Sequence, residues 1–405
     1  MNIDEIIYDW NQVAQDTPRS KSIELCDETL RDGLQSPSVI DPPIEIKQQM
    51  LQFMNDLGIY IADIGLPGAG PRAVSDVKKL AEYIRDQRLS IKANCAARTV
   101  VADIKPIAEI QDQVGIPIVA YCFLGTSPIR QYAEDWDLEK LFTITDQAIS
   151  FALKQNLEVA FVTEDTTRSR PDTLKKLFEH VISLGCKRLV LCDTVGHATP
   201  HGTEQLVQWT KNLIQTSKES IQLDWHGHND RGLGVINSIV AAHAGCDRIH
   251  GTCLGIGERV GNASIDQLIV NFKLLGEYSH DVSQLVQYVE LTSKACHIDI
   301  PVNYPLSGSD AFRTATGVHA AAVIKAENRG NQLLADMIYS GVPAIWFGKK
   351  QEIEIGPMSG LSNIRYWLQK RGFIASDEKI QEIFKHAKNS CRVLNDEELT
   401  DLLAN

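Results

Sequence analysis

The sequence predicts an α/β fold, namely a (β/α)8 TIM barrel followed by a mainly helical C-terminal subdomain. Eight short apolar segments alternate with longer amphipathic segments, and this alternation stops after about residue 280. Eight such units over about 250 residues match the size of this barrel. A doubly wound open sheet is the alternative, but it has no need of eight units. We expect an N-terminal extension over residues 1–21, the barrel over 22–280 and the helical subdomain over 281–405.

The eight apolar segments are the expected strands of the barrel. Most are nearly continuous runs of apolar, often β-branched residues, which is typical of strands covered by helices on both faces. The expected strands span residues 22–27, 60–65, 90–96, 117–123, 158–165, 188–193, 221–228 and 248–255.

The segments between the strands have the period of amphipathic helices. Residues 43–58 place Ile44, Met50 and Met54 on one face, and residues 170–185 begin with a Pro-Asp pair and end in glycine, as helices often do. After the barrel, three short closing helices are expected, the last two with Ser or Asn caps. The sequences of these three helices cover residues 361–372, 376–390 and 395–405.

Composition excludes several classes of protein. The net charge is −12 and no basic stripe is present, so we expect no nucleic-acid partner. No apolar run reaches the roughly 18 residues that a membrane span needs, and the polar start of the chain does not resemble a signal peptide. The nine cysteines are scattered and form no CxxC pair, which is typical of reduced thiols. We therefore expect a cytoplasmic protein.

Titratable side chains gather where the expected strands end. Active sites of such barrels lie at the C-terminal ends of the strands, so these residues are the candidates for chemistry. They are Asp27, Arg31 and Asp32 after the first strand, Glu164 and Arg168 after the fifth, Asp193, Thr194 and His197 after the sixth, and Glu258, Arg259 and Asn262 after the eighth.

The seventh strand ends in His226 and His228, one residue apart. Residues i and i+2 of a strand point to the same face, so both imidazoles can reach one ion. A catalytic divalent metal takes two or three imidazole or carboxylate ligands and leaves positions open for substrate. Asp32 is the candidate carboxylate. Such mixed ligands suit Zn²⁺, Mn²⁺, Mg²⁺ or Co²⁺. The alternative is that the two histidines are merely the polar end of a strand.

Three motifs together resemble a known family. "DETLRDG" (27–33), "HGHNDRG" (226–232) and "GIGERVGN" (255–262) occur in the order found in the metal-dependent Claisen-type acyltransferases, the family of 2-isopropylmalate, citramalate and homocitrate synthases. The resemblance covers about residues 22–280 and is closest to the 2-isopropylmalate synthases. The third motif lacks the glycine- and cysteine-bearing loop of the hydroxymethylglutaryl-CoA lyases, which favours the synthases over the lyases.

The resemblance implies a metal site and groups that act on a 2-oxo acid. Asp32, His226 and His228 would bind the divalent metal, with Asn262 as a further ligand. Arg31 would stabilise the alkoxide that develops on the keto oxygen. Two further residues follow: Thr194 would hydrogen-bond the substrate carboxylate, and Glu164 would act in proton transfer or orient the group that does.

The resemblance also implies where the base for acetyl-CoA lies. The family places a histidine and a tyrosine of the C-terminal subdomain in the barrel of the partner subunit, and His319 and Tyr339 occupy the matching positions. This implies a homodimer with exchanged subdomains. The alternatives are a histidine on a helix surface and a tyrosine that only packs. The regulatory domain that binds the end-product amino acid in long relatives is expected to be absent.

The sequence departs from the family at the border of the substrate pocket. Asp63 and Leu34 stand where relatives commonly have Glu, and Arg130 stands where many have His. The 2-oxo acid expected is 2-oxoisovalerate, as in leucine biosynthesis, with pyruvate and 2-oxoglutarate as alternatives. A distal carboxylate would need an extra cation, which Arg98, Arg130 or Arg168 could provide. A lyase or aldolase on the same barrel and a non-catalytic metal-binding protein are the competing functions.

Overall fold

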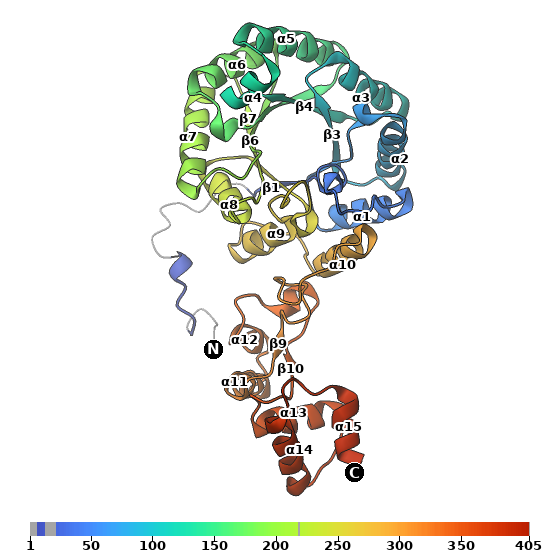
Figure 1. Cartoon of the computed structure of the whole chain (residues 1–405), viewed down its shortest axis with the longest axis vertical. Helices are drawn as coiled ribbons and strands as arrows, with labels where there is room; N and C mark the ends of the chain where they lie inside the picture. The colour runs from blue at the N-terminus through green and yellow to red at the C-terminus, as the bar shows by residue number, and fades with distance from the viewer. Residues whose placement is uncertain (1–5, 13–21, 218, 405) are drawn as a thin grey trace. The chain divides into compact units, whose positions relative to one another are not determined.

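Eight parallel strands form a closed barrel in the computed structural model, which describes residues 6–12, 22–217 and 219–404 (Figure 1). Each strand pairs with the next along the chain, and β8 returns to pair with β1. This closure confirms the predicted barrel and shows that the open-sheet alternative is wrong. The strands are β1 (Glu24–Asp27), β2 (Ile61–Asp63), β3 (Lys92–Arg98), β4 (Ile118–Gly125), β5 (Glu158–Glu164), β6 (Arg188–Asp193), β7 (Gln222–Gly227) and β8 (Arg248–Gly251).

Helices surround the barrel, as Figure 1 shows for its blue-to-yellow part. In α6 the first-turn Pro171 has the backbone angle that a helix start requires, and Gly185 ends the helix in the left-handed region. The helix buries Leu177, Phe178 and Val181. The helices are α1 (Ile44–Asp56), α2 (Pro71–Gln87), α3 (Val101–Val114), α4 (Pro128–Glu134), α5 (Leu138–Lys154), α6 (Pro171–Leu184), α7 (Pro200–Thr216), α8 (Gly234–Ala244), α9 (Ile265–Leu274) and α10 (Leu285–Cys296).

The eighth strand is shorter than the sequence predicts. It ends at Gly251, and Cys253–Gly255 form a 3-10 turn in which Leu254 has a φ of 59°. The chain can turn here because Gly255 also takes a left-handed conformation, with a φ of 64°. The turn returns the following loop toward β7, where Asn262 forms an isolated antiparallel bridge with His228.

The interior of the barrel is part apolar and part ionic. Buried apolar residues from five strands form one cluster, and buried polar groups lie beside it. Among the polar groups, Asp224 on β7 forms ion pairs with Arg188 on β6 and with Arg248 on β8. Tyr121 on β4 accepts a hydrogen bond from Arg248. The apolar cluster contains Cys26, Ile61, Val119, Tyr121, Ala160, Val190 and Cys192.

The chain divides into two compact units, of which the barrel unit includes residues 22–281 and 287–299, and the C-terminal unit includes 282–286 and 300–404. The C-terminal unit is mainly helical, as predicted, and adds a small two-stranded parallel sheet. Two apolar clusters stabilise it, one around Val323 and one around Trp367. Its elements are β9 (Arg313–Thr314), α11 (Gly317–Asn328), α12 (Gln332–Met337), β10 (Glu352–Ile353), α13 (Leu361–Arg371), α14 (Asp377–Asn389) and α15 (Asp396–Ala404).

The caps predicted for the last two helices are present. The hydroxyl of Ser376 accepts the backbone N–H of Lys379 at the start of α14, and Asn395 accepts that of Glu398 at the start of α15. Most of the predicted N-terminal extension lies outside the described residues, which include only 6–12 of it. No described helix combines the length and apolar character needed to cross a bilayer.

Candidate active site

Asp32, His226 and His228 lie together at the C-terminal end of the barrel. Nε2 of His226 is 3.6 Å and Nε2 of His228 is 3.7 Å from Oδ2 of Asp32. One ligand atom from each residue lies within 4.8 Å of the other two, and all three residues are buried. Strand parity accounts for the two histidines. Asp32 reaches them because closure of the sheet leaves only β8 between β1 and β7.

Asn262, the fourth candidate ligand, forms a backbone bridge with His228. Its amide nitrogen donates to the carbonyl of Ile256 at 3.1 Å, whereas its Oδ1 is buried and accepts no hydrogen bond. A buried oxygen without a partner is costly unless a ligand satisfies it. Burial, and then the charge of His226, lower the pKa of His228 to about 4, so this imidazole is neutral, as a metal ligand must be. Two imidazoles, one carboxylate and one amide oxygen together suit a divalent ion.

Arg31 lies beside this donor set and is held by three carboxylates. Its guanidinium is 2.8 Å from Asp63, 2.9 Å from Glu28 and 3.5 Å from Asp32. Burial acts to lower the pKa of Arg31, but the carboxylates outweigh it and raise the pKa above its usual value. The group is therefore a fixed cation next to the candidate metal ligands. Asp63, expected at the substrate pocket, does not line the cavity but is one of the carboxylates that orient Arg31.

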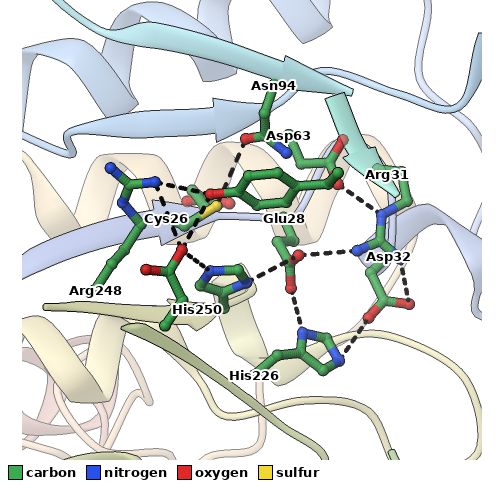
Figure 2. Close-up of polar contacts among 12 residues, drawn as sticks. Cys26, Glu28, Arg31, Asp32, Asp63, Asn94, His226, Arg248 and His250 are labelled. Carbon is green, nitrogen blue, oxygen red and sulfur yellow. Dashed lines mark hydrogen bonds and ion pairs between the residues drawn. The ribbon is translucent and has the colours of Figure 1, made fainter. Parts of the chain in front are cut away.

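Two residues that the sequence analysis missed, Glu28 and His250, lie directly behind the candidate metal ligands (Figure 2). Oε2 of Glu28 is 2.6 Å from Nδ1 of His226, and Oε1 is 3.2 Å from Nδ1 of His250. Burial acts to lower the pKa of His250, but Glu28 and Asp224 raise it to about 9. The sequence did contain a sign of both residues. Glu28 belongs to the same motif as Arg31, and His250 lies two residues after Arg248, so these last two point to the same face of β8.

A cavity of about 500 Å³ opens above these residues. Thr194 and Glu164 line it, as the sequence predicts. The hydroxyl of Thr194 accepts the backbone N–H of Asp165 at 2.8 Å, so its own proton is free to donate. Burial raises the pKa of Glu164, while Arg130 opposes the rise. The apolar part of the lining is Leu66, Ala96, Tyr121, Phe123, Val162, Val190 and Cys192.

The three arginines considered for a distal carboxylate do not line this cavity. Arg98 is bound to Asp103 at 2.8 Å and its side chain is 66% exposed. Arg130 is paired with Glu134 and Glu164 at 3.1 and 3.5 Å. Arg168 is paired with Asp165 at 2.8 Å.

His319 and Tyr339 lie side by side in the C-terminal unit. His319 is in the first turn of α11, and Tyr339 follows α12. Their rings are stacked, with centroids 4.0 Å apart and an angle of 28° between the planes. Both residues are exposed, Tyr339 by 48%. The structure therefore brings together the two candidates for the base, and both are accessible on the surface of their own unit.

Comparison with known proteins gives one family and one group of relatives. The HMGL-like family profile matches residues 22–295. The 2-isopropylmalate synthase of Halothermothrix orenii is 30% identical over 368 residues, which cover 89% of this chain and 68% of that protein. The enzyme of the same name from Pyrococcus abyssi is 30% identical over 91% of this chain and 74% of its own length. That from Sulfurisphaera tokodaii is 28% identical over 93% of this chain and 92% of its own.

Solved structures share the barrel. The hydroxymethylglutaryl-CoA lyase of Pseudomonas aeruginosa has a TM-score of 0.56 at 17% identity, over 68% of this chain and 93% of that one. The HMG-CoA lyase of Brucella melitensis has a TM-score of 0.55 at 16% identity, over 69% of this chain and all of that one. At these identities the likeness concerns the fold alone.

Proposed function

This chain belongs to the HMGL-like family, and we propose that it is an acyltransferase that condenses acetyl-CoA with a 2-oxo acid. The preferred 2-oxo acid is 2-oxoisovalerate, which gives 2-isopropylmalate and CoA, a reaction of leucine biosynthesis. The observation that carries the proposal is the cluster of Asp32, His226 and His228 beside a fixed Arg31, in a chain whose relatives are named 2-isopropylmalate synthases.

The site would activate the 2-oxo acid as an electrophile. A divalent ion held by Asp32, His226, His228 and Asn262 would polarise the keto oxygen. Arg31 stabilises the negative charge that develops on this oxygen. Because carboxylates already orient its guanidinium, no reorganisation is needed during the reaction. Thr194 donates its free hydroxyl proton to the substrate carboxylate.

The other substrate must lose a proton from its methyl group. A base takes this proton, the methyl carbon forms a bond with the keto carbon, and water then hydrolyses the thioester to release CoA. We assign the base to His319, and Tyr339 is stacked against it and fixes its ring. In a homodimer, His319 of one subunit would act in the barrel of the other subunit. Glu164 is the second candidate, since it lines the cavity and its pKa is raised.

The cavity favours an uncharged side chain on the 2-oxo acid. Part of its wall is apolar, including Phe123, Val162 and Val190. A dicarboxylate such as 2-oxoglutarate would bring a second negative charge, yet Arg98, Arg130 and Arg168 lie outside the lining and are paired with carboxylates. Arg259 does line the cavity, but it is already paired with Asp230. Removing a charge from water without a partner is costly. These contacts support 2-oxoisovalerate, with pyruvate as the smaller alternative.

A thiol-release assay tests the proposal. Purified protein with Mn²⁺, Mg²⁺, Zn²⁺ or Co²⁺ should release CoA thiol from acetyl-CoA only when a 2-oxo acid is present. We expect 2-oxoisovalerate to give the highest kcat/KM among 2-oxoisovalerate, pyruvate, 2-oxobutyrate and 2-oxoglutarate. Absence of thiol release with all four acids and every metal would contradict an acyltransferase. Cleavage of hydroxymethylglutaryl-CoA instead would favour the lyase.

A further inference from the structure

A buried network of carboxylates and imidazoles lies behind the candidate metal ligands. The proposed reaction uses the contact of Glu28 with Arg31 but not its contacts with His226 and His250. Glu28 is its centre and is only 2% exposed. Its Oε2 contacts His226 at 2.6 Å, and its Oε1 contacts Arg31 at 2.9 Å and His250 at 3.2 Å. Figure 2 shows Glu28 between the two histidines, with Arg31 on its other side.

We propose that Glu28 is a positioning residue that fixes the ring of His226 and the guanidinium of Arg31 relative to each other, and that His250 holds Glu28 in place. The inference rests on the proposed metal site. A single carboxylate, that of Glu28, thus aligns a metal ligand, His226, with Arg31, the cation that stabilises the alkoxide.

The first argument concerns the proton of His226. A carboxylate can only accept hydrogen bonds, so the contact with Oε2 of Glu28 requires that Nδ1 of His226 carries a proton. In the neutral ring the lone pair then lies on Nε2, the atom that faces Asp32 at 3.6 Å. Glu28 thereby selects the tautomer that can bind a metal. A carboxylate behind a ligating histidine also makes the imidazole a stronger ligand.

The second argument concerns the rigidity of Glu28. His250 donates one ring N–H to Glu28 and the other to Asp224, both at 3.2 Å. Its ring stacks on Tyr121 with an angle of 8° between the planes. Asp224 is itself paired with Arg188 and Arg248. Because each group is buried and hydrogen-bonded, Glu28 cannot rotate away without leaving a charge unpaired.

Two other roles fit the contacts less well. The two oxygens of Glu28 already accept three hydrogen bonds, which stabilise its ionised form and make it a poor base toward a substrate. Cys26, Glu28 and His250 form a second group with close donor atoms. However, both nitrogens of His250 are engaged, and burial raises the pKa of the Cys26 thiol well above its usual value, so the thiolate that binds metals is disfavoured.

Metal titration tests the inference. Metal-free protein is titrated calorimetrically with Mn²⁺ and with Zn²⁺, comparing the parent chain with Glu28→Gln. We expect Glu28→Gln to bind the metal about 10- to 100-fold more weakly, as is found when the partner of a ligating histidine is removed. The matched control is Asp63→Asn, which removes another buried carboxylate from Arg31 but does not touch His226. Asp63→Asn should keep the parent Kd for the metal.

A second readout is the tautomer of His226, measured by nitrogen–proton correlation NMR of the metal-free protein. The parent chain should show a proton on Nδ1 of His226, whereas Glu28→Gln should show a mixture. If Glu28→Gln fails to fold, the double variant Glu28→Gln/His250→Gln removes the anion and its cationic partner together and should show the same loss of affinity.

The outcomes separate this inference from the proposed function. If the parent chain binds neither metal, the metal site itself is refuted and the inference falls with it. If the parent chain binds metal and the Glu28 variants bind it equally well, only the inference is overturned. A lower Tm with an unchanged Kd would make Glu28 a merely structural residue. A proton on Nε2 of His226 in the parent chain would also overturn the inference.

Discussion

Oε2 of Glu28 lies 2.6 Å from Nδ1 of His226, and the same carboxylate contacts Arg31 through its other oxygen at 2.9 Å. One buried side chain thus connects a candidate metal ligand with the cation beside it. The geometry suggests that the site is rigid before substrate binds, because each of the three residues is held by charged partners. The following predictions test the parts of this arrangement separately.

Removing a metal ligand should abolish metal binding and turnover together. We expect His226→Ala to bind the metal more than about 100-fold more weakly, since the loss should exceed that caused by removing an outer partner. Calorimetric titration and the thiol-release assay measure the two effects. A matched control is His201→Ala, an exposed histidine at the start of α7, which should change neither. Full activity of His226→Ala would refute the site.

Replacing Arg31 should slow the reaction without removing the metal. Arg31→Lys keeps the charge but loses the planar fork that contacts Asp63 and Glu28 together. We expect kcat to fall by about 10²- to 10³-fold, as on removal of a group that stabilises a developing anion. The metal Kd should stay close to that of the parent. The control is Arg85→Gln, which changes a half-exposed arginine on α2 and should keep the parent kcat. A kcat of Arg31→Lys equal to that of the parent would contradict the role assigned to Arg31.

Mixing two inactive variants tests whether the C-terminal unit acts in a partner's barrel. His226→Ala damages the barrel site and His319→Ala damages the proposed base. If each site uses a barrel from one subunit and His319 from the other, random exchange in a homodimer should restore about a quarter of the parent activity. If both residues act within one chain, the mixture stays inactive. Near-normal turnover of His319→Ala alone would move the base elsewhere, and Glu164 would be tested next.

The loop that carries Asn262 should not tolerate a side chain at Gly261. This glycine has a φ of 82°, and a Cβ there would lie 1.7 Å from the carbonyl oxygen of Gly255. We expect Gly261→Ala to displace Asn262 and weaken metal binding. The matched control is Gly276→Ala, whose φ is 74° but whose Cβ would meet no atom within 4 Å.

The two glycine variants separate backbone strain from collision. Gly276→Ala should cost only the strain of a left-handed alanine, about 1 kcal/mol, and should leave the metal Kd unchanged. Urea unfolding and calorimetric titration of both variants give the comparison. Equal metal affinity for Gly261→Ala and the parent would show that Asn262 is not held by this loop, or is not a ligand.

The barrel could be predicted from local patterns in the sequence, as could the position of several candidate site residues. The alternation of apolar and amphipathic segments is a local property, and it correctly predicted eight strands closing into one barrel. Strand parity is local too, so the shared direction of His226 and His228 followed from their spacing. The family also followed from three short motifs. The roles of individual site residues stay predictions, because they depend on ligands and on a partner subunit.

Which groups from distant strands meet depends on how the sheet closes, and this could not be predicted from the sequence. Closure of the sheet puts Glu28 after β1 against His226 on β7 and His250 on β8, and no periodicity along the chain contains that pairing. Arg98, by contrast, is the last residue of β3 and pairs with Asp103, five residues later, so its side chain is exposed and does not reach the cavity. Periodicity fixes the face of an element on which a residue lies. Its partner across the barrel depends on strand register and on the charges packed there.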